Sequence, residues 1–269
     1  MQDRPVVAPV GTSPILAADE PPPVWHHNPG AGSPFLLVGD HAGNRVPRGL
    51  GDLGLPLSER ERHIGWDIGI ASLGVRLADR LAASFVHQTY SRLVIDCNRR
   101  PGAPDSIPPV SDGTMVPANA DVSAEEAAAR AAAIHAPYQA AIAAELDWRA
   151  GAGLSTILVA LHSFTPVMRG VARPWEVGVL HDAGDNRFAR GLLDAFAKDP
   201  ALTVGDNEPY SMDTIDYTIP HHAYPRDLPY AEIEIRQDLL GDETGVGEWV
   251  ERLAVCLPAA AEAMGRRCG

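Results

Sequence analysis

The sequence predicts a three-layer α/β fold, in which a mostly parallel or mixed central sheet has helices on both faces. Short apolar segments typical of buried strands, such as "PFLLVGD" and "STILVALHSF", alternate along the chain with longer segments that have the apolar spacing of a helix. Such alternation favours strands that are joined by helices covering both faces of the sheet.

The predicted elements follow in order along the chain. Strands are expected at residues 34–40, 84–90, 92–98, 155–164, 176–182 and 230–240, and helices at 70–83, 123–151, 187–199 and 245–264. The helix at 123–151 starts with a capping-box pattern, Ser123 followed by Glu126, and we expect it to bend near Pro137 and to end at Gly151. Residues 1–33 are rich in proline and glycine and predict an extended N-terminal arm, which leaves 34–269 as a single α/β domain.

Composition limits the class of partner. The formal net charge of -13 argues against nucleic acid or an anionic membrane surface. The three cysteines are far apart and form no CxxC pair, which indicates a reducing compartment. Neither a signal peptide nor an apolar stretch of membrane-spanning length is recognisable, so we expect a cytoplasmic protein of unknown oligomeric state.

Two of the apolar strands, "LLVGDH" and "LVALHS", end in a histidine. Because sites form at the carboxyl ends of parallel strands, His41 and His162 are expected at the same edge of the sheet. Two neutral imidazoles suit Zn²⁺, which needs a third protein ligand in a catalytic site. Asp40, Asn44 and Asp67 are candidates for it, but Asp67 also stands where a helix N-cap is expected.

A proton acceptor and several cations complete the candidate site. Glu232 and Glu234 alternate onto one face of a predicted strand, where they could equally line a solvated edge. Arg92, Arg99 and Arg169 lie near predicted strand ends, and the guanidinium fork matches a carboxylate. Each arginine could also form a purely structural ion pair.

The ordered motifs "DHAGNRVP", "GWDIG", "YSRLVIDCNR", "ALHSFTP" and "EIEIRQDL" resemble those of the N-formylglutamate amidohydrolase family, from about Phe35 to Met264. The resemblance implies an α/β fold of the zinc-dependent exopeptidase kind and a metal-water mechanism. It also implies that His41, Asp67 and His162 hold one divalent metal, expected to be Zn²⁺, and that Glu234 is the catalytic base.

The expected function is therefore metal-dependent hydrolysis of the amide bond in a small acidic N-acyl amino acid, such as the deformylation of N-formylglutamate. Six residues are expected to contact the substrate: Arg92, Asn98, Arg99, Ser163, Arg169 and His222. Two alternatives remain. One is a related zinc amidase that acts on a peptide or cell-wall fragment, and the other is a non-catalytic ligand-binding protein on the same scaffold.

Overall fold

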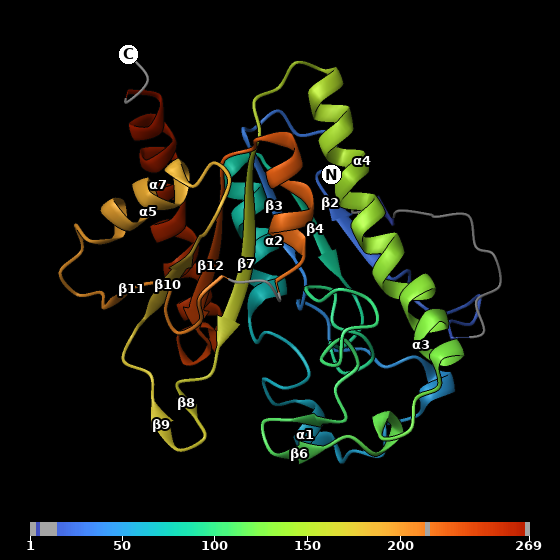
Figure 1. Ribbon diagram of the computed structural model, residues 1–269. Coiled ribbons are helices and arrows are strands. Elements are labelled where there is room, and N and C mark those ends of the chain that lie inside the picture. The colour runs from blue at the N-terminus through green and yellow to red at the C-terminus, as the bar shows by residue number, and fades with distance from the viewer. Residues whose placement is uncertain (1–3, 6–14, 213–215, 267–269) are drawn as a thin grey trace.

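The computed structural model describes residues 4–5, 15–212 and 216–266, and its centre is an eight-stranded mixed sheet (Figure 1). The strand order is β1-β2-β4-β3-β7-β12-β10-β11. The strands are β1 (Arg4–Pro5), β2 (Val24–His27), β3 (Phe35–Gly39), β4 (Ser84–Gln88), β7 (Ile157–Phe164), β10 (Val177–Leu180), β11 (Val204–Asp206) and β12 (Tyr230–Arg236). Two small hairpins lie outside this sheet: β5 (Val110–Ser111) with β6 (Thr114–Met115), and β8 (Val167–Met168) with β9 (Val171–Ala172).

The four central strands, β4, β3, β7 and β12, are parallel to one another. The flanking strands β2 and β10 run antiparallel to β4 and β12. Since β3 and β7 are adjacent and parallel, their carboxyl ends lie at the same edge of the sheet. The predicted juxtaposition of the two His-ending strands is confirmed.

Helices cover both faces of the sheet (Figure 1). On one face lie α2 (Ile70–Leu81), α5 (Arg187–Phe196) and α7 (Glu243–Arg266). On the other lie α3 (Ala124–Arg130), α4 (Ala136–Gly151) and α6 (Thr218–His222), while the one-turn helix α1 (Leu57–Arg60) lies outside these layers. Alternate residues of β3, such as Leu36 and Leu37, belong to the two different apolar cores. This pleat explains why the strand reads as a continuous apolar run, and the predicted three-layer fold is confirmed.

The long helix predicted from residue 123 is also confirmed. The Ser123 side chain accepts a hydrogen bond from the Glu126 backbone amide at 3.1 Å, as a capping residue does. A π-helical turn, Ala131–His135, joins α3 to α4, and α4 ends at Gly151.

Residues 92–98 were expected to form a strand, and this prediction is wrong. The segment is buried, which explains its apolar sequence, but its backbone follows turns. The Asp96 carboxylate accepts a hydrogen bond from the Asn98 backbone amide at 2.9 Å, a local bond that favours a turn over a strand.

The amino-terminal segment contributes to the sheet where it is described. β2 lies within the segment expected as an arm, and it pairs with β4. Residues 1–3 and 6–14 of that segment lie outside the described residues, as does Cys268. Within the described part of the chain, no helix is both long and apolar enough to cross a membrane.

Candidate active site

Three buried side chains meet where β3 and β7 reach the edge of the sheet: His41, Asp67 and His162. His41 follows β3, Asp67 precedes α2, and His162 lies two residues before the end of β7. Asp67 Oδ2 is 2.9 Å from His162 Nδ1 and 3.5 Å from His41 Nδ1. The three potential ligand atoms all lie within 4.8 Å of one another, a spacing at which they could hold one ion.

Two further carboxylates fix the orientation of the imidazoles. His41 Nε2 donates to Asp96 Oδ1 at 2.7 Å, and His162 Nε2 donates to Asp40 Oδ2 at 3.2 Å. A metal bound at the two Nδ1 atoms would require the remaining ring proton to lie on Nε2, where Asp96 and Asp40 accept it. Nδ1 of His41 is buried and has no hydrogen-bond partner in the described part of the chain. Metal-ligating histidines make this kind of outer contact with a carboxylate, so the donor set fits a divalent metal such as zinc.

The side chain of Asp67 does not cap α2. The capping position is Gly69, which has a φ of 86° and no side-chain cap bond. Asp67 Oδ2 instead accepts from the Ser163 backbone amide at 3.3 Å, and Oδ1 lies 3.5 Å from Arg92 Nη1. Burial alone would raise the pKa of Asp67, but His41 and His162 hold that pKa below its usual range. The alternative interpretation as a cap is therefore wrong.

Glu232 and Glu234 lie on one face of β12, and both line the same pocket as the candidate metal residues. β12 lies between β7 and β10, so the alternative of a solvated edge strand is wrong. Glu234 is in register with His162 of β7. Both glutamates are buried, and each has an Oε2 atom with no hydrogen-bond partner in the described structure.

Burial raises the pKa of Glu234 to about 7, and His162 opposes this shift. Burial, followed by the charge of Asp216, raises the pKa of Glu232 well above its usual range. Glu234 is therefore poised between its two forms at neutral pH, and burial favours the protonated form of Glu232. The Arg236 guanidinium, two residues further along β12, pairs with Glu176 and Asp238.

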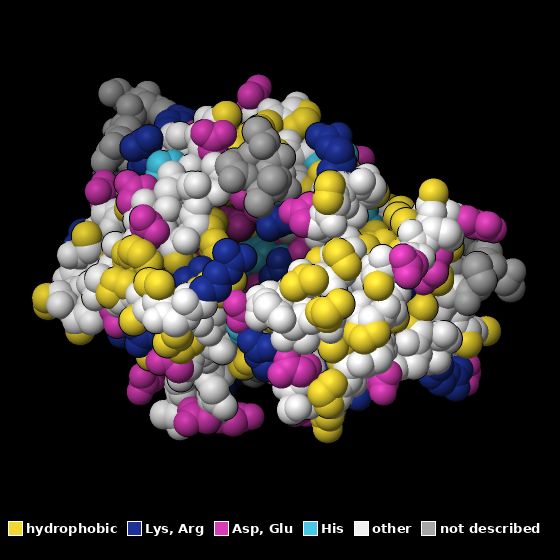
Figure 2. Space-filling model, turned by 60° about the horizontal axis from the view of Figure 1, so that its bottom comes forward, with side chains coloured by type: hydrophobic (Ala, Val, Ile, Leu, Met, Phe, Trp, Pro, Cys, Tyr) yellow, Lys and Arg dark blue, Asp and Glu magenta, His cyan; other side chains and the backbone are white. Residues whose placement is uncertain are grey.

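A pocket of about 420 Å³ lies over this cluster. Figure 2 shows the hollow, with histidine at its bottom and both basic and acidic side chains around it. Its lining includes eight residues that the sequence predicted for the site: His41, Asp67, Arg92, Asn98, Arg99, His162, Ser163 and Glu234. The structure thus brings together residues that are up to 193 positions apart in the sequence.

The two pocket arginines are already paired with carboxylates. Arg92 Nη2 lies 2.6 Å from Asp96 Oδ2, and Arg92 Nη1 faces Asp67. Arg99 is held by Asp105 at 2.8 Å and by Asp216 at 3.2 Å. Both arginines therefore hold carboxylate side chains of the pocket wall in place.

The polar residues Asn98 and Ser163 make contacts that order the site. Asn98 Oδ1 accepts from the backbone amides of Tyr217 and Thr218, each at 2.9 Å. Ser163 Oγ donates to the Ile68 carbonyl at 3.0 Å. These bonds tie neighbouring segments to the pocket.

Arg169 and His222 do not line the pocket. Arg169 is exposed at the turn between β8 and β9, with a φ of 50°. His222 is buried in α6, where its Nε2 donates to Gln139 Oε1 at 2.7 Å. Gln139 in turn donates to Thr218, whose hydroxyl donates to Asp40, so His222 lies behind the cluster at the far end of a hydrogen-bond chain.

Sequence reasoning missed the part played by Asp96, Tyr210 and Asp216, which also line the pocket. Asp96 lies inside the motif around Arg92. Because residues 92–98 were predicted as a strand, the contact of the Asp96 side chain with His41 could not be anticipated. Tyr210 and Asp216 come from a loop with no local pattern that would mark them. Asp40 had been weighed as a metal ligand, and it contacts His162 instead.

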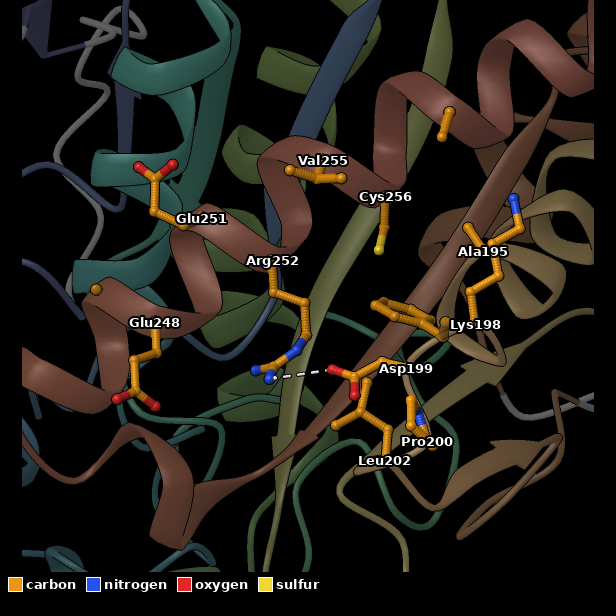
Figure 3. A pocket seen from close by; sticks show the side chains of 13 residues that line it. Ala195, Lys198, Asp199, Pro200, Leu202, Glu248, Glu251, Arg252, Val255 and Cys256 are labelled. Atoms are coloured by element: carbon orange, nitrogen blue, oxygen red, sulfur yellow. Dashed lines mark hydrogen bonds and ion pairs between the residues drawn. The ribbon is translucent and has the colours of Figure 1, made fainter.

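A larger hollow of about 970 Å³ lies between α5 and α7 (Figure 3). Its lining includes Phe196, Val255 and Cys256, together with an ion pair in which Arg252 Nη2 is 3.4 Å from Asp199 Oδ2. No histidine of the described chain lines it. The two groups of potential metal ligands found among the described residues, His41 with Asp67 and His162, and His162 with Glu232 and Glu234, both lie elsewhere. The smaller pocket is therefore the candidate active site.

Comparison with known proteins finds a family and two similar structures. A family model described as N-formylglutamate amidohydrolase matches residues 33–240. The gene product Atu2144 from Agrobacterium tumefaciens is similar, with 34% identity and a TM-score of 0.90, over 93% of this chain and 99% of that chain. The N-formylglutamate amidohydrolase from Ralstonia eutropha JMP134 has the same fold, with 20% identity and a TM-score of 0.63, over 91% of this chain and 98% of that one. The comparison with curated proteins gave no match.

Proposed function

Because this chain belongs to the N-formylglutamate amidohydrolase family, we propose that it hydrolyses the amide bond of a small N-acyl amino acid such as N-formylglutamate. The observation that carries the proposal is the buried cluster of His41, Asp67 and His162, with Glu234 beside it, at the bottom of a pocket. Two nitrogen ligands, one carboxylate and a nearby base are the groups that metal-assisted amide hydrolysis needs.

We propose that His41, Asp67 and His162 hold a divalent metal, most simply Zn²⁺. The support is the chemistry of the donor set and the two outer carboxylates, Asp40 and Asp96, that orient the imidazoles. A zinc ion at this position supplies Lewis-acid chemistry, which polarises an amide carbonyl and acidifies water.

Glu234 acts in this proposal as the general base. Its side chain faces the same pocket as His162, and its pKa near 7 lets it accept a proton from water and return that proton to the leaving amine. Glu232 lies two residues earlier on β12, and burial favours its protonated form, so Glu234 is the better candidate for this role.

Arg92 supplies positive charge beside the cluster. It pairs with Asp96, which orients His41, and its Nη1 lies beside Asp67. A fixed cation at this position stabilises the negative charge that develops on the carbonyl oxygen during attack. The hydrogen bonds of Arg92 hold it in place before substrate enters.

The test is amine release from a panel of N-formyl, N-acetyl and N-succinyl amino acids by zinc-loaded protein. We expect turnover of at least one N-formyl amino acid, its loss with a chelator and its return when zinc is added. Glu251→Gln, at an exposed position of α7, is the control for Glu234→Gln and should retain full activity. If no member of the panel releases amine at full zinc occupancy, the proposed function is wrong.

A further inference from the structure

The two arginines that line the pocket, Arg92 and Arg99, already form ion pairs with carboxylates of the protein. Arg92 is shared between Asp67 and Asp96, and Arg99 between Asp105 and Asp216. A substrate carboxylate at either arginine would compete with two fixed carboxylates for the same donors.

Arg173 differs from them. It follows β9 and is half-buried beside the pocket. Its guanidinium carbon lies 4.6 Å from the centre of the Tyr210 ring and 5.8 Å from that of Phe164, and both aromatic residues line the pocket. Its Nη1 donates to Tyr210 Oη at 2.8 Å, and no carboxylate of the described residues forms an ion pair with it. The rest of its guanidinium fork is available.

The aromatic contacts fix where this cation stands. Tyr210 and Phe164 hold the guanidinium by cation–π contact, which leaves its charge intact. The charge of Arg173 acts on the pocket. Burial is the main cause that lowers the pKa of the pocket residue His63, and the charges of Arg62, Arg92 and Arg173 lower it further. Tyr210 also feels the charge of Glu234, so the ring that contacts Arg173 lies near the candidate base.

We propose that Arg173 is the residue that binds a carboxylate of the substrate, and so selects N-acyl amino acids over neutral amides. The role of Arg173 in substrate selection rests on the proposed function. Its binding of a carboxylate does not, and can be measured without any reaction. The substrate would extend from the metal residues past Tyr210 to the guanidinium. Arg169, four residues earlier on the same hairpin, is the position that the sequence favoured, and its exposed place at the turn removes it from the pocket.

Binding can be measured without turnover. Calorimetric titration of glutarate, a dicarboxylate with no scissile bond, is carried out on the wild type and on Arg173→Gln, Arg173→Lys, Arg169→Gln and Arg190→Gln at matched zinc content. Arg190 on α5, whose Nε lies 3.3 Å from Asn186 Oδ1, is the control for loss of one positive charge away from the pocket.

We expect Arg173→Gln to raise the Kd about 10- to 100-fold, the effect of losing a charge-assisted bond to a carboxylate. Arg173→Lys keeps the charge but not the planar fork, and should give an intermediate value. Arg169→Gln and Arg190→Gln should bind like the wild type. Circular dichroism establishes that each variant is folded.

Turnover then identifies the carboxylate. N-formylglutamine carries only the α-carboxylate, N-formyl-4-aminobutanoate carries only the distal one, and the amide of N-formylglutamine carries neither. We expect Arg173→Gln to raise KM for one of the first two compounds at least tenfold, with little change for the third.

Two outcomes would overturn the assignment. The first is an unchanged Kd for glutarate in folded Arg173→Gln. The second is a rise in Kd in Arg169→Gln that Arg173→Gln does not show, which would return the role to the position favoured by sequence. Weaker glutarate binding in Arg173→Gln without hydrolysis of any N-acyl compound would keep the binding site and refute only the proposed reaction.

Discussion

Replacing Asp40 with asparagine should weaken metal binding without unfolding the protein. Asp40 is buried and holds two donors, His162 Nε2 at 3.2 Å and Thr218 Oγ1 at 2.6 Å. Asparagine has nearly the same shape and keeps one oxygen that can accept the His162 proton. The change therefore removes a negative charge behind the imidazole while leaving its orientation largely intact.

The expected magnitude follows from these contacts. Loss of an outer-shell partner lowers metal affinity by about 10- to 100-fold. Because asparagine still accepts from His162, Asp40→Asn should lie near the lower end, about tenfold or 1.4 kcal/mol. Asp40→Ala should lie near the upper end, and it should also destabilise the fold by about 1–3 kcal/mol for each buried donor left without a partner. Thr218→Val keeps the charge and should lower affinity less than Asp40→Asn.

The assay is competition for Zn²⁺ with a chromophoric chelator, started from protein stripped of metal by dialysis. Thermal unfolding of the same samples separates weaker binding from a loss of folded protein. The reasoning fails if folded Asp40→Asn binds zinc as tightly as the wild type. It also fails if Thr218→Val and Asp40→Asn lower the zinc affinity equally, because the negative charge of Asp40 would then contribute nothing beyond its hydrogen bonds.

Three further predictions concern the cluster and its surroundings. Glu234→Gln should lower kcat about 100-fold or more with zinc retained, whereas Glu232→Gln should be mild; if Glu232→Gln is the inactive variant, the base is two residues away. His162→Ala should lower the zinc content of purified protein measured by elemental analysis, and an unchanged content would remove His162 from the ligand set. Burial holds the pKa of His222 at about 3 against an ordinary value of 6.5, so its stabilising effect is complete above pH 6.5 and is lost as the pH falls toward 3. Denaturant titrations at pH 7 and pH 5 should show a smaller loss of stability in His222→Gln than in the wild type, by about 2 kcal/mol, and equal losses would mean that His222 is protonated in the fold.

The elements with regular periodicity could be predicted from the sequence. β3 and β7 are buried on both faces, so β3 is apolar throughout and β7 is apolar as far as Leu161, and polar residues appear at or near the carboxyl end of each strand. That change marked His41 and His162 directly. The capping box of Ser123 is a local bond and is equally readable.

The contacts that depend on turns could not be predicted in this way. Asp96 reaches His41 only because residues 92–98 bend, and their apolar sequence was equally compatible with a strand. Local sequence also left Asp67 between a ligand and a helix cap, since a carboxylate before a helix is common in both cases. Arg173 and Tyr210 meet at the pocket through two separate loops, which no spacing in the chain encodes.

The register of β12 against β7 determines both the position of the proposed base and the packing of the apolar core, because successive residues of the strand point to opposite faces. Glu232 and Glu234 face the pocket, while Ile233 and Ile235 on the opposite side of the strand belong to the apolar core. A slip of one residue against β7 would drive both carboxylates into hydrocarbon and both isoleucines into the pocket. Such a slip is too unfavourable to be populated, so the folded protein contains β12 in one register only. Inherited variation at Ile233 or Ile235 should therefore produce temperature-sensitive protein whose surviving molecules have normal kinetics, instead of stable enzyme with graded loss of activity.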